Sequence, residues 1–462
     1  MTTEGRATPS LSLRIARHAA TIGVGQVAVI GYAVADTVMT GRHNSADLAA
    51  LSLGAAVYVS VYIALTGIVQ ALIPVVGHHH GAGDPDGVRR SFQQAVWLAL
   101  AVALPGMAVL LAPGPLFALV KADPAVAERV RDYLSWLAWA LPPGLAFRVY
   151  GALNQGLSRP LLVTLLQLGA LALKLPLNAW LIFGGAGVPP LGVAGCGLAT
   201  LIVQWTLALV ALGMLAGHPA HRALRLFEHW SGPRWSAQRE LLRLGLPTGA
   251  TLFFEVSGFA LMAVFIGRLG TTPLAAHQIV ANVTSVVYML PLSIGIATGA
   301  LTAQSLGAGA GPQARAVWRR GLALALALVT LAGAGLLAAR GPLVRAYSTD
   351  PAVQAVARHL LLFIVVSQLA DAVQCVLSFA LRSYRVALLP ALCYALGLWG
   401  VGLGGGALLA FHPPVGWPAA LSGPAAFWFA NGLALLAVAG LLWALLQRVS
   451  TEAAPRVASS AG

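Results

Sequence analysis

Three carboxyl groups interrupt long apolar stretches of this chain, and they are its strongest candidates for chemistry. Glu255 lies near the middle of the apolar stretch 245–270, while Asp36 and Asp371 lie in two other apolar stretches. About 20 apolar residues cross a bilayer core, and an ionisable side chain at that depth costs several kcal/mol unless it has a partner, a proton or water. We therefore expect the three acids to take part in ion coupling, and a structural ion pair or a hydrogen-bonded acid is the alternative at each position.

The coupling ion expected at these acids is either a proton or Na⁺. Burial increases the affinity of a carboxyl group for a proton, and carboxylate oxygens also suit a hard cation. Glu255 and Asp371 are therefore the candidate ligands of a Na⁺ ion, and proton coupling stays open beside it.

Polar side chains in other apolar stretches are candidates for the substrate site. Lys174 and Asn178 are four residues apart, which places both on one face of a helix. Two interpretations of Lys174 are open: it neutralises Asp36, or it extends toward the membrane surface. The stretch that follows Glu255 is also rich in polar residues, which either line a water-filled path or pack between helices. The substrate-site candidates in that stretch are Gln278, Asn282 and Tyr288.

The composition is typical of a membrane protein with many spans. Of 462 residues, 58% are hydrophobic and only 9% are charged, which excludes a soluble globular fold. The three cysteines all lie in apolar stretches, so no disulfide framework is expected. The net charge of +14 comes from small groups of arginines between apolar stretches. This pattern is typical of cytoplasmic loops, and we expect no nucleic-acid partner.

Charge-free intervals and turn residues divide the chain into twelve predicted transmembrane helices. The expected fold class is an all-α polytopic membrane protein with two six-helix lobes. The predicted spans are residues 16–38, 48–76, 92–112, 133–153, 161–183, 192–216, 245–267, 274–303, 321–340, 358–380, 387–411 and 421–446.

The distribution of Lys and Arg sets the expected orientation and domain division. With the N-terminus in the cytoplasm, 18 of the 28 basic residues fall on the cytoplasmic side and 8 on the outer side, while Arg148 and Lys174 lie in or near spans. This bias places both termini in the cytoplasm. The arginine-rich segment 217–243 is the predicted cytoplasmic linker between an N-terminal lobe, residues 1–216, and a C-terminal lobe, residues 244–462.

An internal repeat supports the division into two lobes. A shift of 226 residues places VMTGRHNSADLAAL (residues 38–51) over VFIGRLGTTPLAAH (residues 264–277), with six of fourteen positions identical. Six spans per half is an even number, so the halves share one orientation and are related by an axis along the membrane normal, with a site between the lobes. Because the shift places Glu255 over a valine, we expect the two lobes to have diverged in function.

Motifs for enzymatic chemistry are absent from the sequence. A Walker A loop needs Gly-Lys followed by Ser or Thr, but the two lysines, Lys121 and Lys174, are followed by Ala and Leu. No HExxH motif occurs either. We therefore expect neither an enzyme nor a cofactor other than the coupling ion, and ATP is not the expected direct energy source.

Several motifs resemble the multidrug and toxic compound extrusion (MATE) family, in its NorM branch. In the second half they are FFEV around Glu255, LAAHQIVAN (residues 274–282) and ADAVQ around Asp371, and in the first half VADTVMTGR (residues 34–42) and PVVGHHHGAG (residues 74–83). The resemblance covers nearly the whole chain. It implies an antiporter that exports cationic or amphipathic drugs through a V-shaped cleft and is driven by inflow of Na⁺ or H⁺.

By position, the resemblance implies that Asp36 is the acid of the first lobe, with Asn178 near it, and that Glu255 and Asp371 are the pair of the second lobe. It also implies a multi-pass protein of the inner (plasma) membrane, which we expect to act as a monomer on small drug molecules. The alternative within the wider superfamily is a flippase for lipid-linked saccharides. A flippase needs several cations in its cleft to bind pyrophosphate, and only two are candidates here.

Two residues depart from the family pattern. Ser367 stands where the NorM pattern has a tyrosine four residues before the acid of span 10, and Lys174 stands where an asparagine is expected. A fixed positive charge beside Asp36 repels Na⁺ from the first lobe. The resemblance and this departure together favour the second lobe as the coupling site.

Overall fold

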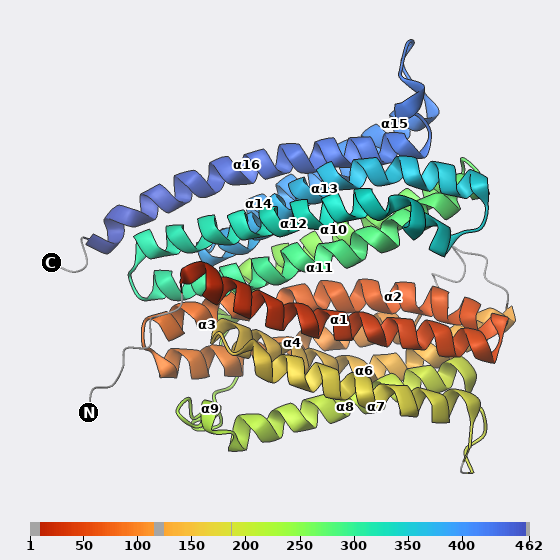
Figure 1. Ribbon diagram of the computed structural model, residues 1–462. Coiled ribbons are helices and arrows are strands. Elements are labelled where there is room, and N and C mark those ends of the chain that lie inside the picture. The colour runs from red at the N-terminus through yellow and green to blue at the C-terminus, as the bar shows by residue number, and fades with distance from the viewer. Residues whose placement is uncertain (1–9, 115–123, 186, 459–462) are drawn as a thin grey trace, which may run out of the picture. The chain divides into compact units, whose positions relative to one another are not determined.

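The computed structural model describes residues 10–114, 124–185 and 187–458, and these residues are almost entirely helical (Figure 1). The helices of the first half are α1 (Leu11–His43), α2 (Ser45–Val69), α3 (Leu72–Gly81), α4 (Pro85–Leu111), α6 (Pro124–Gly156), α7 (Pro160–Phe183), α8 (Gly192–Gly217) and α9 (Pro219–Arg222). Those of the second half are α10 (Trp235–Gly267), α11 (Thr271–Gly307), α12 (Gly311–Tyr347), α13 (Pro351–Ser383), α14 (Leu388–Ala395), η1 (Leu396–Gly405), α15 (Gly406–Phe411), η2 (Ala419–Leu421) and α16 (Pro424–Ala458).

All twelve predicted spans coincide with helices, which confirms the all-helical membrane fold. Eleven described segments are long and apolar enough to cross a membrane, with α2 and α3 counted as one segment. Helix α6 corresponds to the remaining predicted span, residues 133–153. It is as long as several of the others, but it contains Pro142, Pro143 and Arg148, which make it less apolar.

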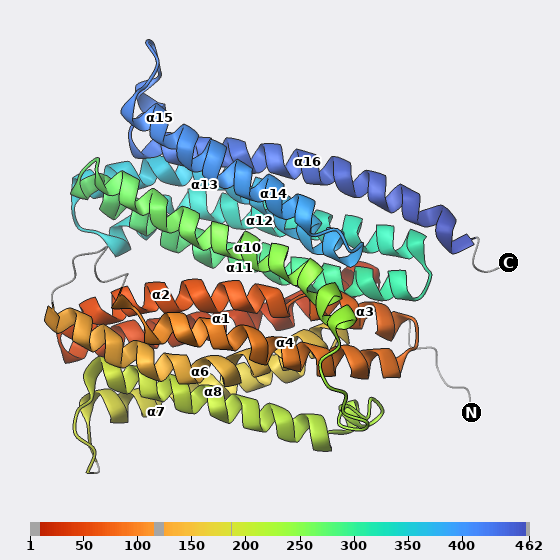
Figure 2. The ribbon, with the colours of Figure 1, turned by 180° about the vertical axis from the view of Figure 1, so that it is seen from behind.

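The eleventh predicted span is not a regular α-helix. It begins as α14, continues as the π-helical segment η1 and ends as α15 (Figure 2). Segment η1 has the sequence LGLWGVGLGG, in which half of the residues are glycines. Glycine lowers the stability of a regular α-helix because its backbone loses more conformational entropy on ordering. It also has no side chain to crowd a wider turn, so this sequence tolerates π-helical geometry.

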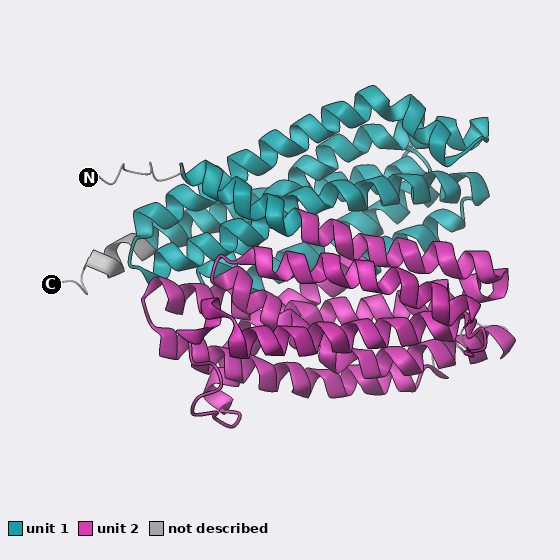
Figure 3. Ribbon diagram, turned by 60° about the horizontal axis from the view of Figure 1, so that its bottom comes forward, with its two compact units in different colours: residues 1–23, 257–462 teal, residues 24–256 magenta. Residues whose placement is uncertain are grey.

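The described chain forms two compact units (Figure 3). Unit 2 is Val24–Val256, and unit 1 is Ser257–Gly462 together with the chain up to Gly23. In unit 2, α6 packs against α2, α4 and α8, and α7 packs against α8. In unit 1, α13 packs against α11, α12 and α16.

The unit boundaries fall inside the first helix of each half. The start of α1 belongs to unit 1, where Gly23 lies against Ser293 of α11. The start of α10 belongs to unit 2, where it packs on α2. Each of these two helices is therefore shared by both units. The predicted division of the lobes at residues 217–243 stays a prediction.

Two glycines, one helical turn apart, allow α10 to contact α2. A Cβ atom added at Gly245 would lie 2.4 Å from the carbonyl oxygen of Ile68, and one at Gly249 would lie 2.5 Å from that of Ala64. Such small-xxx-small spacing lets two membrane helices approach closely enough for backbone contact. The position of the first part of α10 within unit 2 therefore depends on the absence of side chains at these two residues.

We expect Gly249→Val to destabilise the protein by about 1–3 kcal/mol, because the added side chain must displace the α2 backbone. The matched control is Gly169→Val, because Gly169 is exposed on α7 and a Cβ there would meet nothing within 4 Å. The melting temperature of each purified variant measures the effect. Equal melting temperatures for the two variants would contradict the close packing of α10 on α2.

Candidate functional site

The centre of unit 2 contains a buried ion pair. The Lys174 ammonium on α7 lies 3.0 Å from Oδ2 of Asp36 on α1. The Lys174 side chain is 3% exposed and that of Asp36 is 14% exposed. Of the two interpretations of Lys174, the structure therefore shows the ion pair and not extension toward the membrane surface. Since each charge is expensive alone in a medium of low dielectric constant, the pair makes both tolerable within the spans.

Hydrogen bonds hold both members of the pair. The Lys174 ammonium donates to the Thr200 hydroxyl at 2.7 Å, and that hydroxyl donates to the Cys196 carbonyl oxygen at 3.0 Å. The Asn178 amide donates to Oδ1 of Asp36 at 2.7 Å. Each carboxylate oxygen therefore has a partner of its own, one the ammonium and the other the amide. The ammonium lies where a cation bound to this carboxylate would lie.

Thr200 is a member of this cluster that the sequence did not indicate. A signal for it exists in α8, where Cys196, Thr200 and Gln204 recur every four residues along an otherwise apolar helix. Residues at that spacing share one helix face, and this face carries the Thr200 hydroxyl that, among the described residues, binds Lys174 together with Asp36. A polar stripe on a small-residue helix is the pattern that would have identified it.

The other two acids lie in different units. Glu255 is in α10, one residue before the last residue of unit 2, and Asp371 is in α13 of unit 1. Both are partly exposed. Among the described residues, no three His, Cys, Asp or Glu side chains form a group that could hold a metal ion. The coupling role of Glu255 and Asp371, and Na⁺ binding by them, stay predictions.

The polar residues predicted on α11 differ in exposure. Gln278 and Asn282 are exposed and lie on one face, Tyr288 is partly buried, and His277 beside them is buried. Gln278 and Asn282 are therefore not packed inside unit 1. Exposed amides are unfavourable against hydrocarbon, so water is the environment that suits this face. Their role in substrate binding stays a prediction.

Ser367 lies in a tightly packed part of unit 1. Its hydroxyl is buried without a hydrogen-bond partner, and a Cβ atom added at Gly432 of α16 would lie 2.9 Å from it. The residue that replaces the tyrosine of the family pattern thus contacts a neighbouring helix one turn before Asp371. A larger side chain in this orientation would collide with α16.

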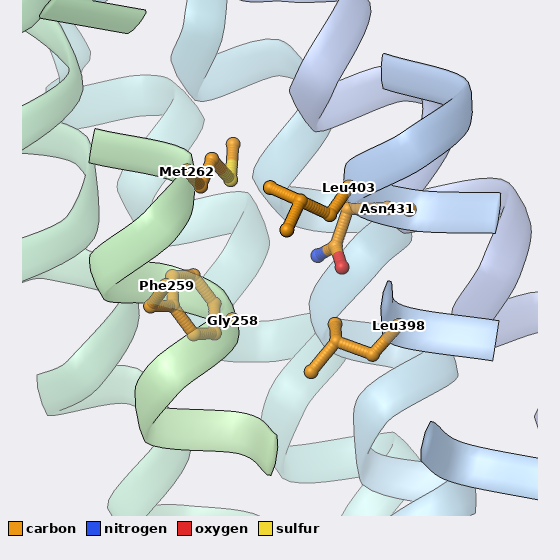
Figure 4. Close-up of a pocket in the computed structure, with 7 residues that line it drawn as sticks. Gly258, Phe259, Met262, Leu398, Leu403 and Asn431 are labelled. Atoms are coloured by element: carbon orange, nitrogen blue, oxygen red, sulfur yellow. The ribbon is translucent and has the colours of Figure 1, made fainter. Parts of the chain in front are cut away.

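Unit 1 also contains a small pocket beside η1 (Figure 4). Its lining residues come from α10, η1 and α16: Gly258, Phe259, Met262, Leu398, Gly402, Leu403 and Asn431. Its volume of about 10 Å³ has room for at most a single water molecule. The pocket is therefore too small to hold a drug molecule.

Comparison with known proteins gives the family of this chain. The MatE family model matches residues 22–180 and 247–407, which is more than half of the chain. The chain belongs to the MATE transporter family. The two matched segments follow the two halves of the chain, and each contains one of the shared helices for most of its length.

Several proteins are similar in sequence to this MATE transporter over most of its length. A probable multidrug resistance protein NorM of Aromatoleum aromaticum is 42% identical over 87% of this chain and 87% of its own length. The multidrug resistance protein PmpM of Pseudomonas aeruginosa is 34% identical over 83% of this chain and 81% of its own. The relatives and the eleven apolar segments make this a multi-pass transporter of the inner membrane.

Solved structures of MATE transporters share the fold. The eukaryotic MATE transporter AtDTX14 has a TM-score of 0.82 at 18% identity, covering 97% of this chain and 99% of its own. The Vibrio cholerae MATE transporter VcmN in the bent form has a TM-score of 0.84 at 16% identity, covering 96% of this chain and 98% of its own. At these sequence identities the comparison supports the fold alone.

The variant Lys174→Asn removes the ammonium that pairs with the Asp36 carboxylate, so this carboxylate can be neutralised by a cation from solution. At pH 8 we expect Na⁺, relative to choline at equal ionic strength, to raise the melting temperature of this MATE variant by more than it raises that of the parent protein. Removal of one partner of a buried pair also lowers stability by about 3–5 kcal/mol. Thermal unfolding in the two salts measures both effects.

The double variant Asp36→Asn/Lys174→Asn is the matched control. It lacks both charges, so its response to Na⁺ should not exceed that of the parent. An equal response of Lys174→Asn and the parent to Na⁺ would show that the ammonium does not occupy a cation position at Asp36.

Proposed function

We propose that this MATE transporter is an efflux antiporter that exports cationic or amphipathic drugs and is driven by inflow of Na⁺ or H⁺. The observation that carries the proposal is the similarity to proteins named as multidrug resistance proteins, at 42% and 34% identity over most of the chain. The composition of the spans agrees with it, because acids within an apolar protein suit the exchange of positively charged solutes. We further propose that the protein acts as a monomer and has no enzymatic activity.

Coupling is proposed to act through Glu255 and Asp371. Helix α10 passes from unit 2 to unit 1 between Val256 and Ser257, and Glu255 lies directly before Val256. A charge that appears or disappears at that point acts on a helix that both units share. An ion and a drug that favour different arrangements of such a helix exclude each other without having to touch.

Asp36 is proposed to serve coupling only through Lys174. The ammonium compensates the carboxylate permanently, so Na⁺ has no vacancy to fill there. The coupling ion is therefore proposed to act at Glu255 and Asp371. Transport measurements with Na⁺ and H⁺ gradients applied separately distinguish the two ions.

A lipid-linked saccharide flippase is less well supported. Pyrophosphate recognition needs several positive charges close together. In unit 2, Lys174 is already neutralised by Asp36, which leaves Arg148 as the remaining Lys or Arg side chain within the predicted spans of this unit. A single arginine does not match the charge of a pyrophosphate.

Transport by the purified protein in proteoliposomes tests the function and identifies the ion. We expect ethidium to move against its gradient when an inward Na⁺ or H⁺ gradient is imposed, with only one of the two gradients sufficient. Ethidium fluorescence measures transport, and a gradient of K⁺ alone is the control. Movement of lipid-linked saccharide, and none of ethidium, would establish the flippase instead.

Glu255→Gln is expected to abolish gradient-driven ethidium transport, because the amide neither gains nor loses a proton and holds a cation weakly. The matched control is Glu228→Gln, which removes an exposed acid of the loop between α9 and α10 that pairs with Arg225. The initial rate of ethidium efflux in proteoliposomes with equal protein content measures the loss. Parental rates in Glu255→Gln would remove this residue from the coupling mechanism.

A further inference from the structure

The loop between α9 and α10 carries an exposed pair of aromatic side chains (Figure 2). The rings of Phe227 and Trp230 are stacked, with centroids 6.3 Å apart and planes 11° apart. Both residues are 42% exposed. Contact between apolar rings and water is unfavourable, so a stacked pair that stays outside the protein is a candidate contact surface.

Two buried glutamines of α4 hold this loop in place. The Gln93 side-chain amide donates to the carbonyl oxygens of Leu226 and Glu228, at 3.0 Å and 3.2 Å. The Gln94 side-chain amide donates to the carbonyl oxygen of Gly232 at 2.9 Å. These acceptors lie on both sides of the aromatic pair in the chain, so the loop is fixed in the conformation that exposes the two rings.

The backbone of the loop is strained beside both rings. Arg225, two residues before Phe227, has a φ of 46°, and His229, directly before Trp230, has a φ of 47°. Residues with a side chain rarely adopt this left-handed conformation, and it persists only where the surrounding structure enforces it. The turn that presents the aromatic pair is therefore kept in a locally unfavourable form by its contacts with α4.

The membrane surface lies close to this loop. The loop joins α8 to α10, and both helices are long and apolar enough to cross a membrane. Near the end of α8, Leu209 and Leu212 are exposed, as expected of a surface that faces lipid chains. Aromatic rings, above all those of tryptophan, favour the headgroup region between hydrocarbon and water. The chain topology thus makes the bilayer surface the neighbour of the aromatic pair.

The charge of the loop is predominantly positive. Arg222, Arg225 and Arg234 are exposed, whereas Glu228 is the one acid between residues 219 and 234. Glu228 pairs with Arg225 at 3.6 Å, and such an exposed pair contributes little. Among the described residues, neither Arg222 nor Arg234 forms an ion pair. This charge complements the phosphates of anionic lipids.

We propose that the loop of residues 222–234 docks on the membrane surface and binds anionic phospholipids. Phe227 and Trp230 enter the headgroup region, and the guanidinium groups of Arg222 and Arg234 bind lipid phosphates. Because α10 begins at Trp235, directly after the loop, docking fixes the start of this shared helix against the membrane. The inference goes beyond the efflux function and depends on neither the substrate nor the coupling ion.

Quenching of Trp230 fluorescence by brominated phospholipids measures docking. The full-length protein is placed in nanodiscs of phosphatidylcholine, or of its mixture with phosphatidylglycerol, with bromine on the acyl chains close to the headgroup. The chain has 12 tryptophans, so the Trp230 signal is the difference between the parent and Trp230→Phe, which keeps an aromatic ring. We expect the quenched fraction of this signal to be at least about twofold larger in the mixture.

Variants of exposed residues separate the contributions of charge and of the rings. Arg222→Gln should lower the ratio of docked to undocked loop about fivefold in the mixture and leave it unchanged in phosphatidylcholine. Phe227→Ser should lower the ratio in both lipids. The matched control is Arg345→Gln, which removes an exposed arginine near the end of α12, at the opposite membrane surface, and should change neither ratio.

A control for the signal is Trp318, which is fully buried, so the difference between the parent and Trp318→Phe should show no quenching. Equal quenching of Trp230 in both lipids, or none in either, would overturn the proposal. A second copy of the chain is the other possible occupant of this surface. If Trp230 is shielded from acrylamide only in nanodiscs that hold two copies, the second copy covers the aromatic pair and the proposal fails.

Discussion

The interior of this transporter depends on the compensation of charge in a medium that does not solvate it. Asp36 and Lys174 meet this constraint together, because each would be expensive alone within the spans. The pair also determines where Asn178 and Thr200 act, since their side chains satisfy the remaining hydrogen bonds of the two charged groups. A carboxylate that could have bound an ion from solution therefore has a cation that belongs to the protein.

The same constraint applies to Arg148, the other basic residue within the predicted spans of unit 2. Arg148 donates to the Tyr62 hydroxyl, and its guanidinium lies over the Tyr62 ring. Lys174 instead has a carboxylate partner in Asp36. The difference lies in the side chains that the neighbouring helices provide.

In the proposed mechanism, helices α1 and α10 link ion binding to conformational change. Each begins in one unit and ends in the other, and Glu255 lies beside the boundary in α10. Glycines at 245 and 249 hold the first part of α10 against the α2 backbone. A shared helix with one firmly packed end and one acid at its crossing point is suited to convert a change of charge into a change of conformation.

The sequence by itself determined the twelve spans, the three intramembrane acids and the family, because the length and hydropathy of a span are local properties imposed by bilayer thickness. It left open whether Lys174 would pair with Asp36, and it indicated neither the contribution of Thr200 nor the π-helical form of η1. Only the tertiary structure decided these points. Contacts between helices depend on how each helix is rotated and how closely its neighbours approach, and small residues such as Gly249 set that approach through atoms that are distant in the chain.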